Sequence, residues 1–270
     1  MTVRSILAHV IDAAASAHVL AAAGTLAHAF DATVHGLHIR EPLVMPMAGL
    51  GDVPSSVIDA WQSAIERRVV EAKTAFATQG LKGSCSVVDG DPVAAIARAS
   101  RAVDLTIIAQ ANPEADAALA REGIADELVF RIASPLLSIP YIGLQATLGS
   151  TVAVAWNDTR EAFRAVRESI PLLTKADSVT VISIDTGDAP IGGVPELLEY
   201  LKGYGVPAVA KRVVADNSGI GDTLLSTIAD LGSDLVVMGA YGHSRLRELV
   251  LGGATRDLLR HMTVPVLMAH

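Results

Sequence analysis

The sequence predicts an α/β protein with two tandem Rossmann-like domains, each a doubly wound sheet of five parallel strands. Three observations predict this architecture. Apolar runs of strand length alternate with helical patterns along the whole chain, which is typical of doubly wound sheets. Runs such as residues 179–184 are apolar on both faces, as strands covered by helices on both sides are. Finally, the whole pattern occurs twice.

The first copy is predicted to begin with a strand and to alternate strands and helices to its end. Its strands are expected at residues 3–10, 33–39, 84–88, 104–110 and 135–141. Its helices are expected at residues 14–30, 56–79, 92–102 and 116–132. The second copy repeats this order, with strands expected at residues 151–156, 178–184, 207–214, 234–239 and 264–269. Its helices are expected at residues 160–173, 194–204, 219–231 and 253–262.

The two copies align without a gap over their later parts. Residues 104–108 resemble residues 234–238 at an offset of 130, and this offset also aligns Leu128 with Leu258, Pro135 with Pro265 and Leu137 with Leu267. Near the starts the offset is 146, so the first copy carries about sixteen additional residues. We place them at residues 41–56, as a lid, an apolar binding surface or a plain loop. The predicted domains are residues 1–142 and 150–270.

Composition narrows the classes of function. The chain has 270 residues, 51% of them hydrophobic, which favours packed cores over disorder. Its net charge is −8 and its basic residues are scattered, which argues against nucleic acid as a partner. The single cysteine, Cys85, excludes a disulfide within the chain and favours the cytoplasm. No apolar run reaches the roughly 20 residues of a membrane span, so no membrane partner is expected.

A glycine-rich stretch follows the fourth strand of the second copy. It reads Gly-Ala-Tyr-Gly at 239–242 and, nine residues later, Gly-Gly-Ala-Thr at 252–255. Glycines at a strand exit let a ligand approach the backbone, and a helix start presents free N–H groups to phosphate. The spacing differs from both the dinucleotide fingerprint and the P-loop.

This stretch resembles the G-2x-G-9x-G-[S/T] element of the universal stress protein family. Residues 154–162 and the ending Pro265-Val266-Leu267 match as well, and the resemblance covers nearly the whole chain. It implies an adenine nucleotide α-hydrolase-like fold with strand order 3-2-1-4-5, binding ATP or another adenine nucleotide, with Mg²⁺ as an accompanying ion. It also implies that the last strands of the two domains pair as an intrachain pseudo-dimer. A homodimer of two chains is a further expectation.

The resemblance places the nucleotide contacts in the second copy. Asn157 stands where family members carry an Asp that contacts adenine, and an amide both donates and accepts. Two apolar positions would sandwich the base, and the glycine-rich stretch would face ribose and phosphates, which adds Ile184, Met238, Gly239, Gly242, Gly252, Gly253, Ala254 and Thr255. Gly253 departs from the Ser or Thr of ATP-binding members and removes one hydroxyl donor. The alternative is that the glycines only make turns and close packing.

The first copy has lost the pattern. At the equivalent positions it carries Ile11, Ala109, Asn112 and Glu122, and only Gly123 survives. A carboxylate beside a triphosphate repels it, so we expect at most one nucleotide per chain. Three histidines, His9, His35 and His38, lie near strand ends, but His35 and His38 differ in strand parity and are expected to face opposite sides. We therefore expect no metal site.

The sequence favours a stress-response or regulatory protein that binds a nucleotide without efficient turnover. Hydrolysis needs an oriented water and stabilisation of charge on the transferred phosphoryl group, and no paired carboxylates or catalytic residues are evident. Two alternatives stay open. The first alternative is a scaffold that acts through protein contacts without nucleotide, and the second is a weak ATP hydrolase.

Overall fold

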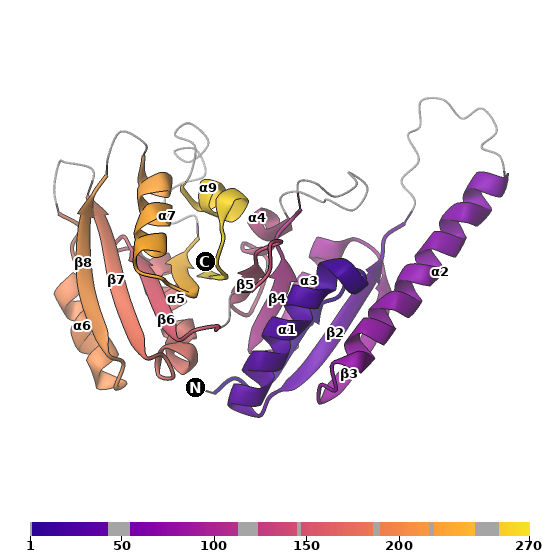
Figure 1. Ribbon diagram of the computed structural model, residues 1–270, viewed down its shortest axis with the longest axis horizontal. Coiled ribbons are helices and arrows are strands. Elements are labelled where there is room, and N and C mark those ends of the chain that lie inside the picture. Colours follow the sequence, from indigo (N-terminus) through magenta and orange to yellow (C-terminus); the bar gives the residue numbers. More distant parts are fainter. Residues whose placement is uncertain are drawn as a thin grey trace.

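The computed structural model describes residues 2–42, 55–112, 124–144, 147–185, 190–215, 219–240 and 254–270. Most of the additional segment expected at residues 41–56 lies outside this part of the chain. Within it, strands and helices alternate in the predicted order in both halves (Figure 1).

The first half has its elements in the predicted order, although the helix expected at residues 116–132 ends at Leu128. They are β1 (Ser5–His9), α1 (Ala13–Phe30), β2 (Thr33–Arg40), α2 (Ser55–Thr78), β3 (Gly83–Asp89), α3 (Pro92–Ala99), a 3₁₀ turn η1 (Ser100–Ala102), β4 (Leu105–Ala109), α4 (Ile124–Leu128) and β5 (Leu136–Ile139). The helix expected at 92–102 therefore ends its α-helical part at Ala99 and tightens into η1. At its start, the Asp91 carboxylate accepts a hydrogen bond from the Ala94 amide at 2.9 Å, with Pro92 in the first turn.

The second half follows the same order. Its elements are β6 (Thr151–Trp156), α5 (Arg160–Leu173), β7 (Ser178–Asp185), α6 (Val194–Gly203), β8 (Ala208–Val214), α7 (Ile220–Asp230), β9 (Leu235–Gly239), α9 (Ala254–His261) and β10 (Val266–Ala269). The duplication extends to single hydrogen bonds. Asp104 accepts from the amides of Arg4 and Ser5, and its counterpart Asp234 accepts from the amides that open β6.

All ten strands form one continuous sheet, in the order β3-β2-β1-β4-β5-β10-β9-β6-β7-β8. Each half has the order 3-2-1-4-5 that the resemblance implies, and all pairings within a half are parallel. The last strands of the two halves pair, as the resemblance implies: β5 and β10 run antiparallel and join the two five-stranded sheets into one. The joining satisfies the backbone groups that two buried edge strands would otherwise leave unpaired.

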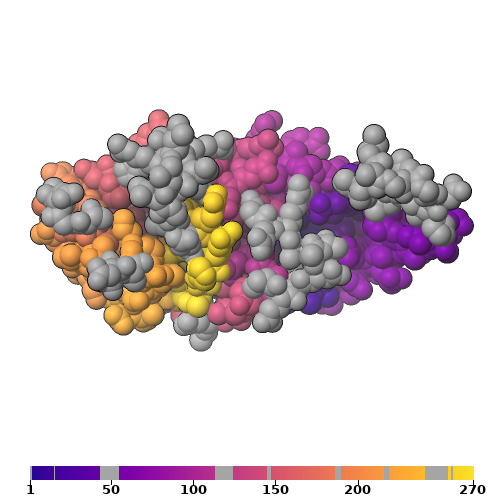
Figure 2. Space-filling model, turned by 90° about the horizontal axis from the view of Figure 1, so that it is seen from above, coloured from indigo at the N-terminus to yellow at the C-terminus, as the bar shows by residue number. Residues whose placement is uncertain are grey.

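Helices cover both faces of the sheet. One apolar cluster lies under α1, α2, α5 and α6, and the other under α3, α4, α7 and α9. The central strands are buried on both sides, as the apolar runs predict. Seen from above, the yellow C-terminal residues lie near the middle of the long axis, between the two halves (Figure 2).

The strand order fixes where a ligand site is expected. In the second half β6 lies between β7 and β9. The strands that follow β6 in sequence, β7 and β8, lie on one side of it, and β9 and β10 lie on the other, so the strand order reverses at β6. In doubly wound sheets ligands bind beyond the carboxyl ends of the strands at this reversal. Asn157, Ile184 and Gly239 all lie at or just beyond the carboxyl ends of these three strands.

Candidate functional site

Asn157, at the exit of β6, is held in place by the start of the next helix. The Thr159 hydroxyl donates to the Asn157 amide oxygen at 2.7 Å. Thr159 also caps α5, because its hydroxyl oxygen accepts from the Ala162 amide at 3.2 Å. The side chain of Asn157 is exposed. With its oxygen engaged, its –NH₂ group retains two donors for a ring nitrogen of a base.

The two predicted sandwich residues lie on the face of the sheet to which Asn157 belongs. Ile184 and Met238 are each 7% exposed and belong to the cluster under α7 and α9. Side chains alternate along a strand, so Asn157 follows the side of Ala153 and Ala155, which border the same cluster. The three predicted base-contacting residues therefore share one face at the carboxyl edge.

Gly239 lies where β9 passes the start of α5, and packing there leaves no room for a side chain. A Cβ atom at Gly239 would lie 2.3 Å from the Ala162 nitrogen and 2.6 Å from the Glu161 carbonyl carbon. Both neighbours are backbone atoms, so they cannot yield as a flexible side chain would. The structure thus gives Gly239 a packing role, and its contact with a nucleotide stays a prediction.

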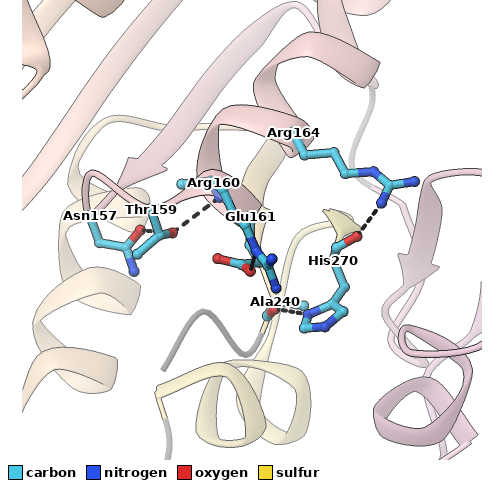
Figure 3. A network of polar contacts seen from close by, with 8 residues as sticks. Asn157, Thr159, Arg160, Glu161, Arg164, Ala240 and His270 are labelled. Carbon is cyan, nitrogen blue, oxygen red and sulfur yellow. Dashed lines mark hydrogen bonds and ion pairs between the residues drawn. The ribbon is translucent and has the colours of Figure 1, made fainter. Parts of the chain in front are cut away.

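A polar network follows α5 from this point to the last strand (Figure 3). Glu161 is 5% exposed and forms an ion pair with Arg160. Burial raises the pKa of the Glu161 carboxyl, but the hydrogen bond from Arg160, a backbone hydrogen bond and the charges of Arg160 and His270 together outweigh burial, so this pKa lies below its usual range. His270 Nδ1 donates to the Ala240 carbonyl at 2.9 Å, and Arg164 donates to the His270 carbonyl at 2.7 Å.

The phosphate end of the predicted site is described only in part. Ala254 begins α9, and Thr255 is 4% exposed, so its side chain is covered by protein. Gly242, Gly252 and Gly253 lie outside the described residues.

Comparisons with known proteins agree with this fold. The sequence profile of the universal stress protein family matches residues 2–120 and again residues 151–270. The chain belongs to the universal stress protein family. It is similar in structure to a universal stress protein from Archaeoglobus fulgidus, with a TM-score of 0.75 and 16% identity over 99% of this chain and 96% of that one.

Two further relatives extend the comparison. A functionally unknown protein from Pseudomonas aeruginosa has a TM-score of 0.59 and 17% identity, over 99% of this chain and 92% of that one. Universal stress protein Slr1230 of Synechocystis is 53% identical over 38 residues, which are 14% of this chain and 13% of that relative. The structural likenesses show the fold, and the short sequence match covers only a small part of either chain.

The first half of this universal stress protein presents a different edge. Ile11, which stands in place of Asn157, offers an apolar side chain, and its amide donates to the Ser16 hydroxyl at 2.8 Å. Glu122 and Gly123 lie outside the described residues, whereas Ala109 ends β4. His9 and His38 are buried and His35 is exposed, in agreement with the predicted parity. The described residues contain no cluster of three metal-ligating side chains, and none of their helices could cross a membrane.

Sequence reasoning missed several residues at the edge of the second half. Thr159 could have been found, because Thr before a helical pattern is a capping signal. Asp185, which follows Ile184, is buried, pairs with Arg212 of β8 and accepts from the Ile191 amide at 3.0 Å. The hydrogen bond from Arg212 is the main cause that lowers the pKa of Asp185. Glu161 pairs with its neighbour Arg160, whereas no local pattern marks the role of His270, since its partners come from distant segments.

Proposed function

We propose that this universal stress protein binds one adenine nucleotide in its second half and acts as a nucleotide-dependent regulatory protein. The observation that carries the proposal is the convergence of Asn157, Ile184 and Met238. They come from three neighbouring strands and share one face at the carboxyl edge, where the strand order reverses. This edge offers both the polar and the apolar chemistry that a purine base requires.

The chemistry of the three residues favours a purine base as the ligand. The amide of Asn157 donates hydrogen bonds to ring nitrogens, and its orientation is fixed by Thr159. Ile184 and Met238 supply an apolar and polarisable surface for the faces of a flat ring. The start of α9 supplies N–H groups toward phosphates, as the family motif implies for Ala254 and its preceding glycines.

We further propose that the nucleotide is bound without efficient turnover. A hydrolase needs a group that orients water and a group that stabilises charge in the transition state. The backbone of Glu161 packs against Gly239 at the end of β9, and the pairing of the Glu161 carboxylate with Arg160 disfavours a role as a general base. Mg²⁺ bound with the phosphates and a cytoplasmic location stay predictions.

Two other functions lead to different results. A scaffold would bind no nucleotide, whereas a weak ATP hydrolase would release phosphate repeatedly. The ion pair between Glu161 and the exposed Arg160 favours binding over hydrolysis, and the ordered amide of Asn157 favours binding over a scaffold role.

The test is to purify the chain under native conditions and identify any copurifying nucleotide by mass spectrometry. Titration calorimetry with AMP, ADP and ATP then gives the number of sites and the affinity. Asn157→Ala should weaken binding at least about tenfold, because it removes the donors to the base. Asn112→Ala is the matched control, since it removes an amide from the corresponding edge of the first half.

One site per chain, lost in Asn157→Ala and kept in Asn112→Ala, would support the proposal. Absence of binding at millimolar nucleotide would favour the scaffold, and two equivalent sites would contradict the assignment to the second half. Phosphate release at several turnovers per second, lost in Glu161→Gln, would move the protein into the hydrolase class.

A further inference from the structure

The seam between the two halves has an approximate twofold symmetry. In the antiparallel pair β5–β10, Leu137 lies opposite Leu267, and these two leucines are equivalent in the duplication. Each half therefore presents the same set of positions to the other. A side-chain contact that one half makes, and that the equivalent residues of the other half cannot make in return, shows how the two halves have specialised.

The first such contact involves Gln110, which directly follows β4 of the first half. Its amide nitrogen donates to the carbonyl oxygens of Leu259 at 2.8 Å and Arg260 at 3.0 Å, in the last turn of α9. Its amide oxygen accepts from the Tyr141 amide at 3.1 Å, and the side chain is 8% exposed. Gln110 thereby satisfies carbonyls that a helix end leaves unpaired. The equivalent residue in the second half is Ala240, which has no amide to return this contact.

The second contact joins Phe130 of the first half to His270. Their rings meet edge to face, with centroids 4.7 Å apart. His270 in turn donates to the carbonyl of Ala240 (Figure 3). The backbone amide of Ala240 donates to the carbonyl of Ala269 at 3.0 Å. The equivalents of Phe130 and His270 are Arg260 and Pro140, which offer neither an aromatic ring nor a ring N–H.

A third contact crosses the seam between α4 and α9. Asp126 of α4 lies 3.9 Å from the guanidinium of Arg256 in the first turns of α9, and these two residues are also equivalent in the duplication. The seam therefore sets opposite charges at one symmetric position. Two copies of the second half facing each other would instead oppose Arg256 to itself, which is unfavourable.

We propose that Gln110 and Phe130 are positioning residues for the nucleotide site of the second half. They hold the last turn of α9 and, through His270, the carbonyl of Ala240 at the exit of β9. Ala240 directly precedes residues 241–253, and α9, whose last turn Gln110 holds, directly follows them. The first half, which has lost the nucleotide pattern, thus acts as a brace for the half that keeps it. The role in nucleotide binding rests on the function proposed above.

The test uses the full chain and two variants, Gln110→Glu and Phe130→Leu. Gln110→Glu keeps the acceptor for Tyr141 but faces the two carbonyls of α9 with an oxygen, and Phe130→Leu keeps apolar volume without the ring. The matched control is Ser16→Ala, which removes a buried hydrogen bond that lies wholly within the first half. Hydrogen–deuterium exchange of Ala240 and of α9 is measured together with nucleotide affinity by calorimetry.

Both variants should speed exchange at Ala240 and in α9, and both should weaken nucleotide binding by roughly three- to tenfold, as expected for one lost hydrogen-bonded contact. Ser16→Ala should leave both unchanged, even where it lowers the melting temperature. Unchanged exchange at Ala240 and α9 in both variants would overturn the inference. If the wild-type chain binds no nucleotide, the proposed function fails, and the exchange result alone still decides whether the first half braces these segments.

Discussion

Replacing Gly239 by Ala tests whether packing against α5 is what requires a glycine at the exit of β9. The added Cβ would lie 2.3 Å from the Ala162 nitrogen, against about 3.5–4.0 Å for an ordinary contact between heavy atoms. The start of α5 would therefore have to move by more than about 1 Å. Overpacking of this kind costs about 1–3 kcal/mol of unfolding free energy, and the rigid backbone neighbours favour the upper part of that range.

The assay is urea denaturation followed by circular dichroism, with thermal melting as a second measurement. For a chain of this size, the expected loss corresponds to a fall in melting temperature of about 2–12 °C. Gly203→Ala is the matched control, because no atom lies within 4 Å of the Cβ it would add at the end of α6. That variant should be neutral or gain up to about 1 kcal/mol, since Ala is the better helix residue.

Stability of Gly239→Ala equal to that of the wild type would refute the packing argument. It would show that α5 yields without cost, and the requirement for glycine would then have to come from the nucleotide. A variant that is destabilised but still binds nucleotide with wild-type affinity would separate the two roles completely. Gly239 would then be a residue of the fold, although it belongs to the sequence motif.

Three further predictions concern the two ends of the site and the effect of pH. Gly242→Val should abolish nucleotide binding in calorimetry while the first half stays folded, because the side chain would occupy the space expected for ribose and phosphate. Gly253→Ser should tighten ATP binding, since a hydroxyl bond to a charged oxygen contributes about 1.5–3 kcal/mol, and unchanged affinity would argue for another phosphate geometry. Burial and the nearby His38 lower the pKa of His9 from 6.5 to about 4. The unfolded chain therefore binds this proton first, and stability should fall as the pH drops from 6.5 to 4, by up to about 3 kcal/mol in urea titrations. His9→Met should flatten that dependence, and an equal slope in both proteins would contradict it.

The sequence predicts most of the fold because local patterns and the duplication agree. Strand positions follow from short apolar runs, and β6 and α5 have the predicted ends. The sequence does not show that α3 tightens into a 3₁₀ turn at Ser100, whose hydroxyl bonds the Ala97 carbonyl and accepts from the Ala133 amide. The end of this helix depends on a partner more than thirty positions away, which a local sequence pattern cannot include.

The candidate site likewise has parts that the sequence predicts and parts that it does not. The neighbouring positions of Asn157, Ile184 and Met238 could be predicted, because each follows or lies near the end of a predicted strand, and carboxyl ends of parallel strands share an edge. The contacts of Gln110 and His270 could not be found, since they join residues of different halves. The close packing of Gly239 against α5 follows only from the distances in the structure, because no sequence pattern shows which segments approach each other so closely.

The seam shows why a duplicated chain can keep its symmetry in the pairing of its strands and lose it in the side chains at the strand ends. The pairing of Leu137 with Leu267 is set by backbone hydrogen bonds and by the alternation of buried side chains, so a shift by one residue would turn apolar groups out of both cores. Side chains at the ends of the strands carry no such constraint. There Gln110 and Ala240, or Phe130 and Arg260, could diverge without changing the register. Divergence of this kind lets one half support a site that only the other half contains, and the joined chain keeps the two unlike halves together at high effective concentration.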